Sequence, residues 1–150
     1  MSRILLAEDD QALARGIVAL LRDAGYSVDQ VERGDRVLPM ELAAPSSLIV
    51  LDIGLPDASG LAVLKQIKEA DPDTLVIMLT GQTGVQTAVE AMKNGAFHYA
   101  NKPFDLDELL SRVRNLIARH AHTPWIGLDQ KLGDALEFAG GRVMANFNTF

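Results

Sequence analysis

The sequence predicts an α/β protein built on a doubly wound, five-stranded parallel sheet in the strand order 2-1-3-4-5. Short runs that are apolar on both faces alternate along the chain with stretches whose apolar residues recur at helical spacing. Two of the runs end abruptly on acid, at Glu8 and at Asp52. Alternating strands and helices favour a parallel sheet with helices on both faces. Right-handed crossovers leave few topologies, of which this strand order is a common one.

The expected strands are short and largely apolar. Residues 4–7 read ILLA and residues 48–52 read LIVLD, and such runs are typical of strands buried between two helical layers. Residues 26–31 alternate between apolar and polar types, which also indicates a strand. Two further runs, at residues 75–79 and 96–100, complete the expected sheet.

Helices are expected between the strands and after the last one. Gly25 closes the first helix, Ser59 and Asp105 are the expected N-caps of the third and fifth, and Gly95 stops the fourth. Pro39 lies inside the second helix and removes a backbone hydrogen bond unless that helix begins late or kinks. The expected ranges are residues 12–21, 35–44, 60–70, 84–94 and 105–119.

Composition sets limits on the class of protein. The 150 residues suffice for one domain with a sizeable core, and 48% hydrophobic and 23% charged residues are ordinary for a soluble globular protein. There is no cysteine, and hence no disulfide or thiolate site. The N-terminal apolar run is too short for a signal peptide, and none approaches the roughly 20 residues of a membrane span. We therefore expect a cytoplasmic protein with no membrane contact. The net charge of −6, without a basic block, argues against direct nucleic acid binding.

Acidic residues follow two strands that the predicted order places side by side. In open α/β sheets, ligands bind outside the carboxyl ends of the strands, so Glu8, Asp9 and Asp52 are expected to converge there. Clustered carboxylates repel one another, and a divalent cation relieves that cost. Oxygen ligands suit Mg²⁺, and an aspartate beside Mg²⁺ can attack phosphorus. Taken alone, Asp52 could equally begin a turn, and Asp10 is interpreted as a solvated acid at a helix start.

A hydroxyl and an ammonium are expected at the same edge of the sheet. Thr80 comes directly after the fourth strand and Lys102 follows the fifth. Such groups suit phosphoryl transfer, in which positioning and charge neutralisation dominate catalysis. A surface lysine and an ordinary strand-end threonine are the alternative interpretations. The three histidines show no metal-ligand spacing, and we expect them at the surface.

Together, these residues resemble the receiver domain of bacterial two-component response regulators. The motifs that carry the resemblance are Glu8-Asp9, Asp52, Thr80 and Lys102-Pro103-Phe104. It implies a flavodoxin-like receiver fold in which Asp52 accepts a phosphoryl group from a sensor histidine kinase. Mg²⁺ would be held by Glu8, Asp9, Asp52 and the backbone carbonyl of Gly54, while Thr80 and Lys102 each contact a phosphoryl oxygen. Such a protein is a phosphoacceptor regulator that assists its own phosphorylation and dephosphorylation, and not an enzyme in the ordinary sense.

The resemblance also implies a switch. Tyr99 matches the aromatic switch residue of the family, although a plain core role is the alternative, and Lys102-Pro103 would be a cis peptide. Phosphorylation would change the face formed by residues 84–94, 96–100 and 105–119, through which similar receivers bind a second copy or a downstream partner, and output would include control of transcription. The segment 80–96 most resembles regulators of the nitrogen-regulation class.

Two other classes of protein stay open at this point. One is a phosphatase of the haloacid dehalogenase type, which also uses a strand-end aspartate and Mg²⁺ but needs a second acid where this chain has Gly54. The other is a docking module with a receiver fold that is never phosphorylated. Such a module would usually have lost the acid pair, the acceptor or the lysine, and this sequence retains all of them.

The resemblance covers the chain to about residue 119, so we expect a receiver domain at residues 1–120. Residues 121–150 are expected to be a linker and a short C-terminal extension of unknown role. Activators of the nitrogen-regulation class carry an ATPase and a DNA-binding domain after the receiver, and thirty residues hold neither. The chain is therefore expected to be either a single-domain regulator or a fragment of a longer one.

Overall fold

A computed structural model describes residues 2–81 and 85–120 of the chain. Internal contacts divide the chain into two units, Met1–Val113 and Arg114–Phe150. The first unit holds the sheet and the residues of the candidate site. Of the second unit, residues 114–120 are described, and they are the C-terminal turns of the last helix, where Nδ1 of His120 lies 2.8 Å from the Leu116 carbonyl oxygen. The expected linker and extension at 121–150 lie outside the described residues.

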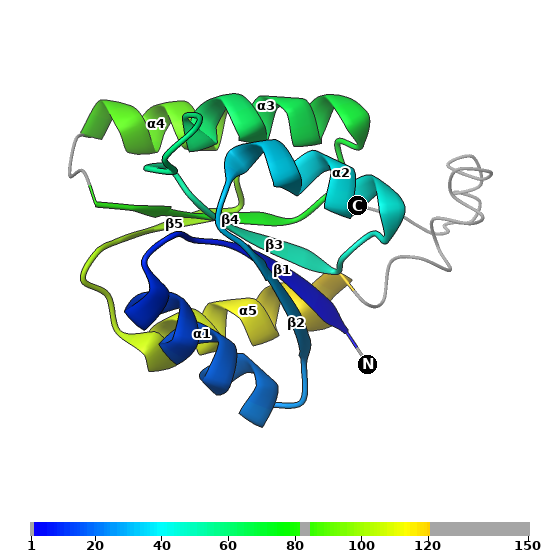
Figure 1. Ribbon diagram of the computed structural model, residues 1–150, viewed down its shortest axis with the longest axis vertical. Helices are drawn as coiled ribbons and strands as arrows, with labels where there is room; N and C mark the ends of the chain where they lie inside the picture. Colours follow the sequence, from blue (N-terminus) through cyan, green and yellow to red (C-terminus); the bar gives the residue numbers. More distant parts are fainter. Residues whose placement is uncertain (1, 82–84, 121–150) are drawn as a thin grey trace. The chain divides into compact units, whose positions relative to one another are not determined.

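The sheet has the predicted strand order, and all neighbouring strands are parallel (Figure 1). Its order is β2-β1-β3-β4-β5, so β1 and β3 are neighbours and the chain reverses direction across the sheet between them. The strands are β1 (Arg3–Ala7), β2 (Ser27–Val31), β3 (Leu48–Asp52), β4 (Val76–Thr80) and β5 (His98–Asn101). The predicted fold class is thereby confirmed.

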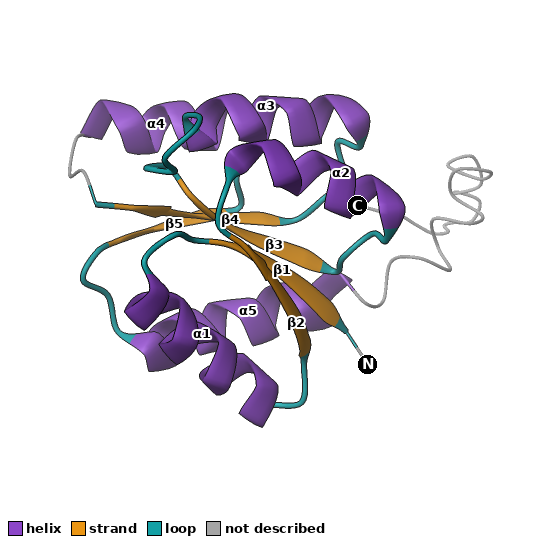
Figure 2. Cartoon of the chain, viewed as in Figure 1, coloured by secondary structure: helices purple, strands orange, loops and turns teal. Residues whose placement is uncertain are grey.

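Helices cover both faces of the sheet, with the strands as a layer between them (Figure 2). Helix α1 and the described start of α5 lie on one face, and α2, α3 and α4 lie on the other. Ser59 caps α3 through its hydroxyl, as expected, and the Asp105 carboxylate accepts a hydrogen bond from the Asp107 N–H at the start of α5. The bounds are α1 (Gln11–Asp23), the 3₁₀ turn η1 (Gly34–Arg36), α2 (Val37–Ala43), α3 (Gly60–Ala70), α4 (Val85–Lys93) and α5 (Leu106–His120).

The second helix begins later than the expected residue 35. A 3₁₀ turn occupies Gly34–Arg36, and α2 starts at Val37. Pro39 is therefore the third residue of α2, where a backbone N–H has no partner within the helix in any case. The late start removes the cost that a proline would impose on a helix interior.

The core lies on both sides of the central strands. Every residue of β3 and β4 is buried, which explains why their sequences are continuous apolar runs instead of alternating ones. The side chains of α3 that face the sheet, Val63, Leu64 and Ile67, are buried against this layer. This packing holds the carboxyl ends of β3 and β4, and hence the residues placed there, on rigid elements.

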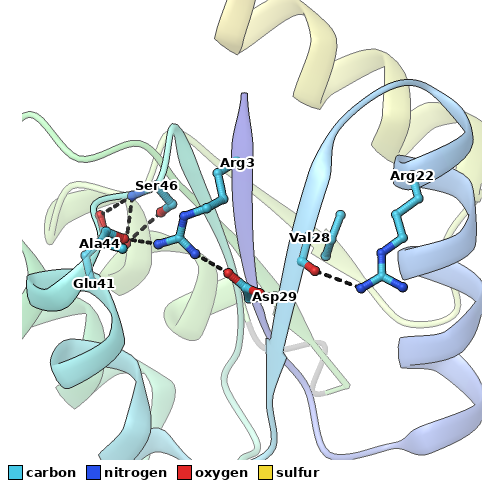
Figure 3. Close-up of polar contacts among 7 residues, drawn as sticks. All are labelled: Arg3, Arg22, Val28, Asp29, Glu41, Ala44 and Ser46. Atoms are coloured by element: carbon cyan, nitrogen blue, oxygen red, sulfur yellow. Dashed lines mark hydrogen bonds and ion pairs between the residues drawn. The ribbon is translucent and has the colours of Figure 1, made fainter. Parts of the chain in front are cut away.

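Polar contacts join the edge of the sheet to the elements around it (Figure 3). Arg3 of β1 forms an ion pair with Asp29 of β2 and donates to the carbonyl oxygen of Ala44, which follows α2. The carboxylate of Glu41, buried in α2, accepts hydrogen bonds from the backbone N–H and the hydroxyl of Ser46. These contacts fix the amino end of β1 and the connection into β3. They lie at the amino ends of the strands, and the acidic residues lie at the carboxyl ends.

Candidate functional site

The site lies at the carboxyl ends of β1, β3 and β4. Asp52 is the last residue of β3, Thr80 is the last residue of β4, and Glu8 directly follows β1. The exposed fractions are 0% for Glu8 and 2% for both Asp52 and Thr80. Three polar residues this deeply buried at one edge of a sheet require partners, because an unpaired buried charge is costly.

Glu8, Asp9 and Asp52 form one acidic cluster. Each offers a carboxylate oxygen, and these oxygens all lie within 4.8 Å of one another. Glu8 and Asp52 are buried and Asp9 is exposed, so the cluster opens to solvent on the Asp9 side. The convergence that the strand order predicts is therefore present in the structure.

The two carboxylate oxygens of Glu8 have different partners. Its Oε2 accepts a hydrogen bond of 3.0 Å from the Asp10 N–H, and its backbone carbonyl accepts one of 3.1 Å from Nε2 of Gln30. Its Oε1 is buried and accepts no well-oriented hydrogen bond from the described residues, although it forms an ion pair with Lys102. Burial raises the pKa of Glu8, and the neighbouring Asp52 charge adds to this, while Lys102 and the Asp10 N–H act against it.

Lys102 contacts both buried carboxylates and offsets part of their negative charge. Its Nζ lies 2.9 Å from Oε1 of Glu8 and 3.2 Å from Oδ2 of Asp52. Burial by itself lowers the pKa of Lys102, but the contacts with Glu8 and Asp52 outweigh burial and raise it, so the ammonium stays charged. The Lys102 backbone N–H donates to the Thr80 carbonyl oxygen at 2.7 Å, and the Lys102–Pro103 peptide bond is cis.

The loop after Asp52 is closed by its own backbone. The Gly54 N–H donates to Oδ1 of Asp52 at 3.1 Å, Gly54 and Ser59 form an antiparallel bridge, and the Gly60 N–H donates to the Ile53 carbonyl oxygen at 2.9 Å. A Cβ at Gly60 would lie 2.4 Å from the Asp52 carbonyl oxygen, so only glycine fits this approach. The loop therefore returns directly over the end of β3.

The two expected switch residues lie on adjacent strands. Thr80 pairs with Asn101 across β4 and β5, and Tyr99 pairs with Met78. The Tyr99 side chain is half-buried and packs against the core, and its ring stacks near His98 at a centroid distance of 6.1 Å. The structure thus places Tyr99 on the strand that leads to Lys102, with part of its ring accessible.

The donor set at this edge fits a hard divalent cation. It consists of carboxylate oxygens, one of them the buried Glu8 Oε1 without a hydrogen bond, and it is accessible from the Asp9 side. Mg²⁺ favours such oxygen ligands together with water and phosphate oxygens. A pocket that combines a buried aspartate, a metal-type donor set and an ammonium group can neutralise a phosphoryl group while a carboxylate attacks it.

The structure brings the predicted residues together, and it adds partners that the sequence does not indicate. Gln30, which holds the Glu8 carbonyl, lies on β2 and carries no motif. The direct contact between Lys102 and Glu8 is a second partner that the sequence does not indicate, because the resemblance implies only a phosphoryl oxygen as the partner of Lys102. A third contact joins Asp57, in the loop after β3, to the backbone N–H groups of Gly34 and Asp35. Each of these contacts joins two residues that lie far apart in the sequence, so no local pattern indicates it.

The strand order and the acidic cluster at the carboxyl ends of β1 and β3 define a doubly wound α/β domain with a candidate metal site. The family model for the response regulator receiver domain matches residues 4–114, and the chain belongs to this family. Receiver domains of this family are parts of two-component systems, in which response regulators act with histidine kinases, and they are signalling proteins and not classical enzymes.

Several known proteins are similar to this chain. The transcriptional regulatory protein DltR of Streptococcus agalactiae is 45% identical over 112 residues, covering 75% of this chain and 50% of the relative. The response regulator protein PmrA of Pseudomonas aeruginosa is 44% identical over 117 residues, covering 78% and 53%. The crystal structure of NtrX from Brucella abortus has a TM-score of 0.78 at 28% identity, covering 90% of this chain and 30% of that one.

The chain spans about half the length of the curated relatives it matches. These relatives carry several names, and NtrX is one among many, so the comparisons support the receiver family without favouring the nitrogen-regulation class. Among the residues that the structure describes, no helix is both long and apolar enough to cross a membrane.

Proposed function

We propose that this chain is the phosphoacceptor domain of a two-component system and that Asp52 takes a phosphoryl group from a sensor histidine kinase. The observation that carries the proposal is the convergence of Lys102 and three carboxylates around the end of β3. Of these carboxylates, Asp52 alone ends a buried central strand, and its two oxygens contact the ammonium group and the Gly54 N–H. It is therefore the best-positioned nucleophile.

In the proposed reaction, a carboxylate oxygen of Asp52 forms a bond to phosphorus while the bond between phosphorus and the kinase imidazole nitrogen breaks. The product is an acyl phosphate, and the imidazole leaves with the electron pair. Lys102 neutralises charge on the transferred group, and the Gly54 N–H holds the other Asp52 oxygen in place. Glu8, Asp9, Asp52 and the Gly54 carbonyl would hold Mg²⁺, which when bound supplies further charge neutralisation to the phosphoryl oxygens.

We propose that output follows from a movement of Thr80. A phosphoryl group adds about −1.5 to −2 charge and three acceptor oxygens, and Thr80 can donate to one of them by moving its hydroxyl inward. This leaves space beside β5 that the ring of Tyr99 can fill. The responding face comprises α4, β5 and the start of α5. Val89 and Met92 of α4 are exposed there, and so is Phe97, which directly precedes β5. A second copy of the chain or a downstream partner would bind there.

The finer assignments are also proposals. Control of transcription as the output is supported by relatives such as DltR, which is a transcriptional regulatory protein. A cytoplasmic location follows if the chain acts as those relatives do. The nitrogen-regulation class rests on the resemblance of residues 80–96 alone. We propose residues 1–120 as the functional receiver unit, with residues 121–150 as an extension.

Labelling with acetyl phosphate and Mg²⁺ tests the proposed function. The wild-type chain should gain one phosphoryl group that is labile to base, and Asp52→Asn should gain none. Undiminished labelling of Asp52→Asn would show that another residue is the acceptor. Absence of labelling in the wild-type chain would instead support a docking module, and turnover of organophosphates would support a phosphatase.

A further inference from the structure

The loop between β3 and α3 is anchored at its far end as well as at its base. The carboxylate of Asp57 accepts hydrogen bonds from the Gly34 N–H at 2.7 Å and from the Asp35 N–H at 2.9 Å. The Arg33 guanidinium lies 3.8 Å from the same carboxylate. Residue 57 as a whole is exposed to solvent, but its side chain, which makes these contacts, is only 12% exposed. The tip of the loop is thus tied to the 3₁₀ turn η1, which lies between β2 and α2.

The two segments fit closely where they meet. Gly34 is buried, and a Cβ there would lie 3.0 Å from Cγ2 of Val63 and 3.2 Å from Cβ of Ala58. Both distances are shorter than ordinary contact, so a larger residue would push the turn away from the loop. The small residue at position 34 therefore allows its N–H to reach the Asp57 carboxylate.

The anchored loop carries groups that face the site. Gly54, two residues after Asp52, donates to Oδ1 of Asp52, and its bridge to Ser59 joins the two sides of the loop. Asp57 lies between Gly54 and Ser59, at the part of the loop that these backbone contacts leave unrestrained. A second anchor at this point restricts how far Gly54 can move relative to Asp52.

We propose that Asp57 is a positioning residue for the Asp52 site. By binding the Gly34 and Asp35 N–H groups, Asp57 fixes the loop after β3. The fixed loop keeps the Gly54 N–H on the Asp52 carboxylate and directs the Gly54 carbonyl to Mg²⁺. The metal part of this inference rests on the proposed function. The competing view is that Asp57 only caps the 3₁₀ turn. Loss of a cap lowers stability without changing the site, whereas loss of an outer partner of a metal ligand typically weakens metal binding by 10- to 100-fold.

The experiment compares Asp57→Ala and Asp57→Asn with the control Asp35→Ala. The control removes one negative charge from the same region, and with it the 2.9 Å ion pair to Arg33, but it leaves both hydrogen bonds to Asp57 in place. Mg²⁺ affinity is measured by calorimetry on each 150-residue chain. We expect Asp57→Ala to bind Mg²⁺ about tenfold more weakly, Asp57→Asn to lose less because one acceptor oxygen remains, and Asp35→Ala to match the wild-type chain.

Hydrogen exchange gives a second readout without metal or phosphodonor. The Gly54 N–H should exchange roughly two- to tenfold faster in Asp57→Ala, the range expected when one net hydrogen bond is weakened. Amides in the centre of β3 report global stability and serve as the internal reference. Gly34→Ala attacks the same contact from the other side, so its effect on Mg²⁺ affinity should not add to that of Asp57→Ala.

The outcomes separate this inference from the proposed function. If the wild-type chain binds Mg²⁺ and labels on Asp52, but Asp57→Ala and Asp57→Asn have wild-type Mg²⁺ affinity and Gly54 exchange, Asp57 is a cap only and the inference is wrong. If the wild-type chain fails to bind Mg²⁺, the proposed function fails, and faster Gly54 exchange in Asp57→Ala would still support the anchoring of the loop. Should Asp57→Ala fail to fold, Asp57→Asn decides.

Discussion

Nζ of Lys102 lies 2.9 Å from Oε1 of Glu8, a carboxylate with no exposed surface. Lys102 also contacts Asp52, so one ammonium group is shared by two buried acids and offsets only part of their charge. The same lysine is the proposed partner of a phosphoryl oxygen. If the Lys102 ammonium leaves the carboxylates to contact a phosphoryl oxygen, the buried charge of Glu8 needs another cation beside it. Mg²⁺ suits this role.

Replacing Lys102 with methionine should separate stability from metal binding. Lys102→Met leaves two buried carboxylates without their cation, so we expect the free energy of unfolding of the metal-free protein to fall by about 1–3 kcal/mol, below the full cost of breaking a buried pair because the ammonium is partly exposed. Mg²⁺ affinity should stay equal or rise, because a competing positive charge is lost. Urea denaturation with and without Mg²⁺ measures both effects.

Lys65→Met, which alters an exposed lysine of α3, is the control for this experiment. It should change neither quantity. Weaker Mg²⁺ binding by Lys102→Met than by Lys65→Met would show that Lys102 organises the acidic cluster and does not merely neutralise it.

Asp9 is the exposed member of the acidic cluster, and its removal should abolish most metal binding. Asp9→Ala should weaken Mg²⁺ binding by more than about tenfold, since even an outer partner of a ligand is worth that much. The metal-free protein should become more stable by up to about 1 kcal/mol, because three repelling acids become two. Calorimetric titration and thermal unfolding of the metal-free chain provide the two measurements.

Asp10→Ser is the matched control for Asp9. It removes a neighbouring charge but retains a side-chain acceptor for the Leu13 N–H at the start of α1. Equal losses of Mg²⁺ affinity in Asp9→Ala and Asp10→Ser would mean that overall charge, and not ligation by Asp9, attracts the cation.

Removal of the Thr80 hydroxyl should uncouple phosphorylation from output. A ligand shifts a conformational equilibrium only by its differential affinity for the two states, and the hydroxyl is the group proposed to distinguish them. Thr80→Ala should still be labelled on Asp52, yet its NMR signals around Tyr99 should not respond to beryllofluoride. Thr80→Ser keeps the hydroxyl and should respond. An equal response in both variants would place the coupling at Lys102 or in the loop after Asp52.

His98 should make stability depend on pH near neutrality. Burial, followed by the nearby Arg112 charge, lowers the pKa of His98 below its ordinary value of 6.5, and Glu108 only partly offsets this. The unfolded chain therefore binds the proton more readily, so stability is complete above pH 6.5 and is lost as pH falls through the lower folded-state pKa. Unfolding free energies of the wild-type chain and His98→Gln from pH 8 to about pH 5 test this, and equal slopes would contradict it.

The fold could be predicted because its determinants are local. The run at residues 48–52 contains its own boundaries, since four apolar residues end on an acid, and the observed β3 has the same limits. Pro39 indicated that the second helix must begin late or kink. The structure shows a late start after a 3₁₀ turn, and that turn depends on how the chain packs around Gly34. Strand β5 begins at His98, two residues after the expected start, because the chain is still in the turn after α4 at Gly95.

The site could be predicted only in part for a related reason. The positions of Glu8, Asp9 and Asp52 follow from the strand order. This order places the carboxyl ends of β1 and β3 side by side, independently of the side-chain contacts made there. The contact of Asp57 with Gly34 depends on two loops that meet across 23 positions of sequence, and neither loop has a periodic pattern. Gln30 is similar, because nothing in a polar residue on β2 indicates that its amide reaches the Glu8 carbonyl.

The close approach of Gly60 to the Asp52 carbonyl has a consequence for library screens of this chain. In a saturation library, position 60 should reject every substitution, because any Cβ would collide with the backbone at residues 52 and 53. Position 59 next to it should accept asparagine and aspartate, which also cap helices. A sharp boundary in mutational tolerance is therefore expected between two adjacent residues, neither of which belongs to the acidic cluster.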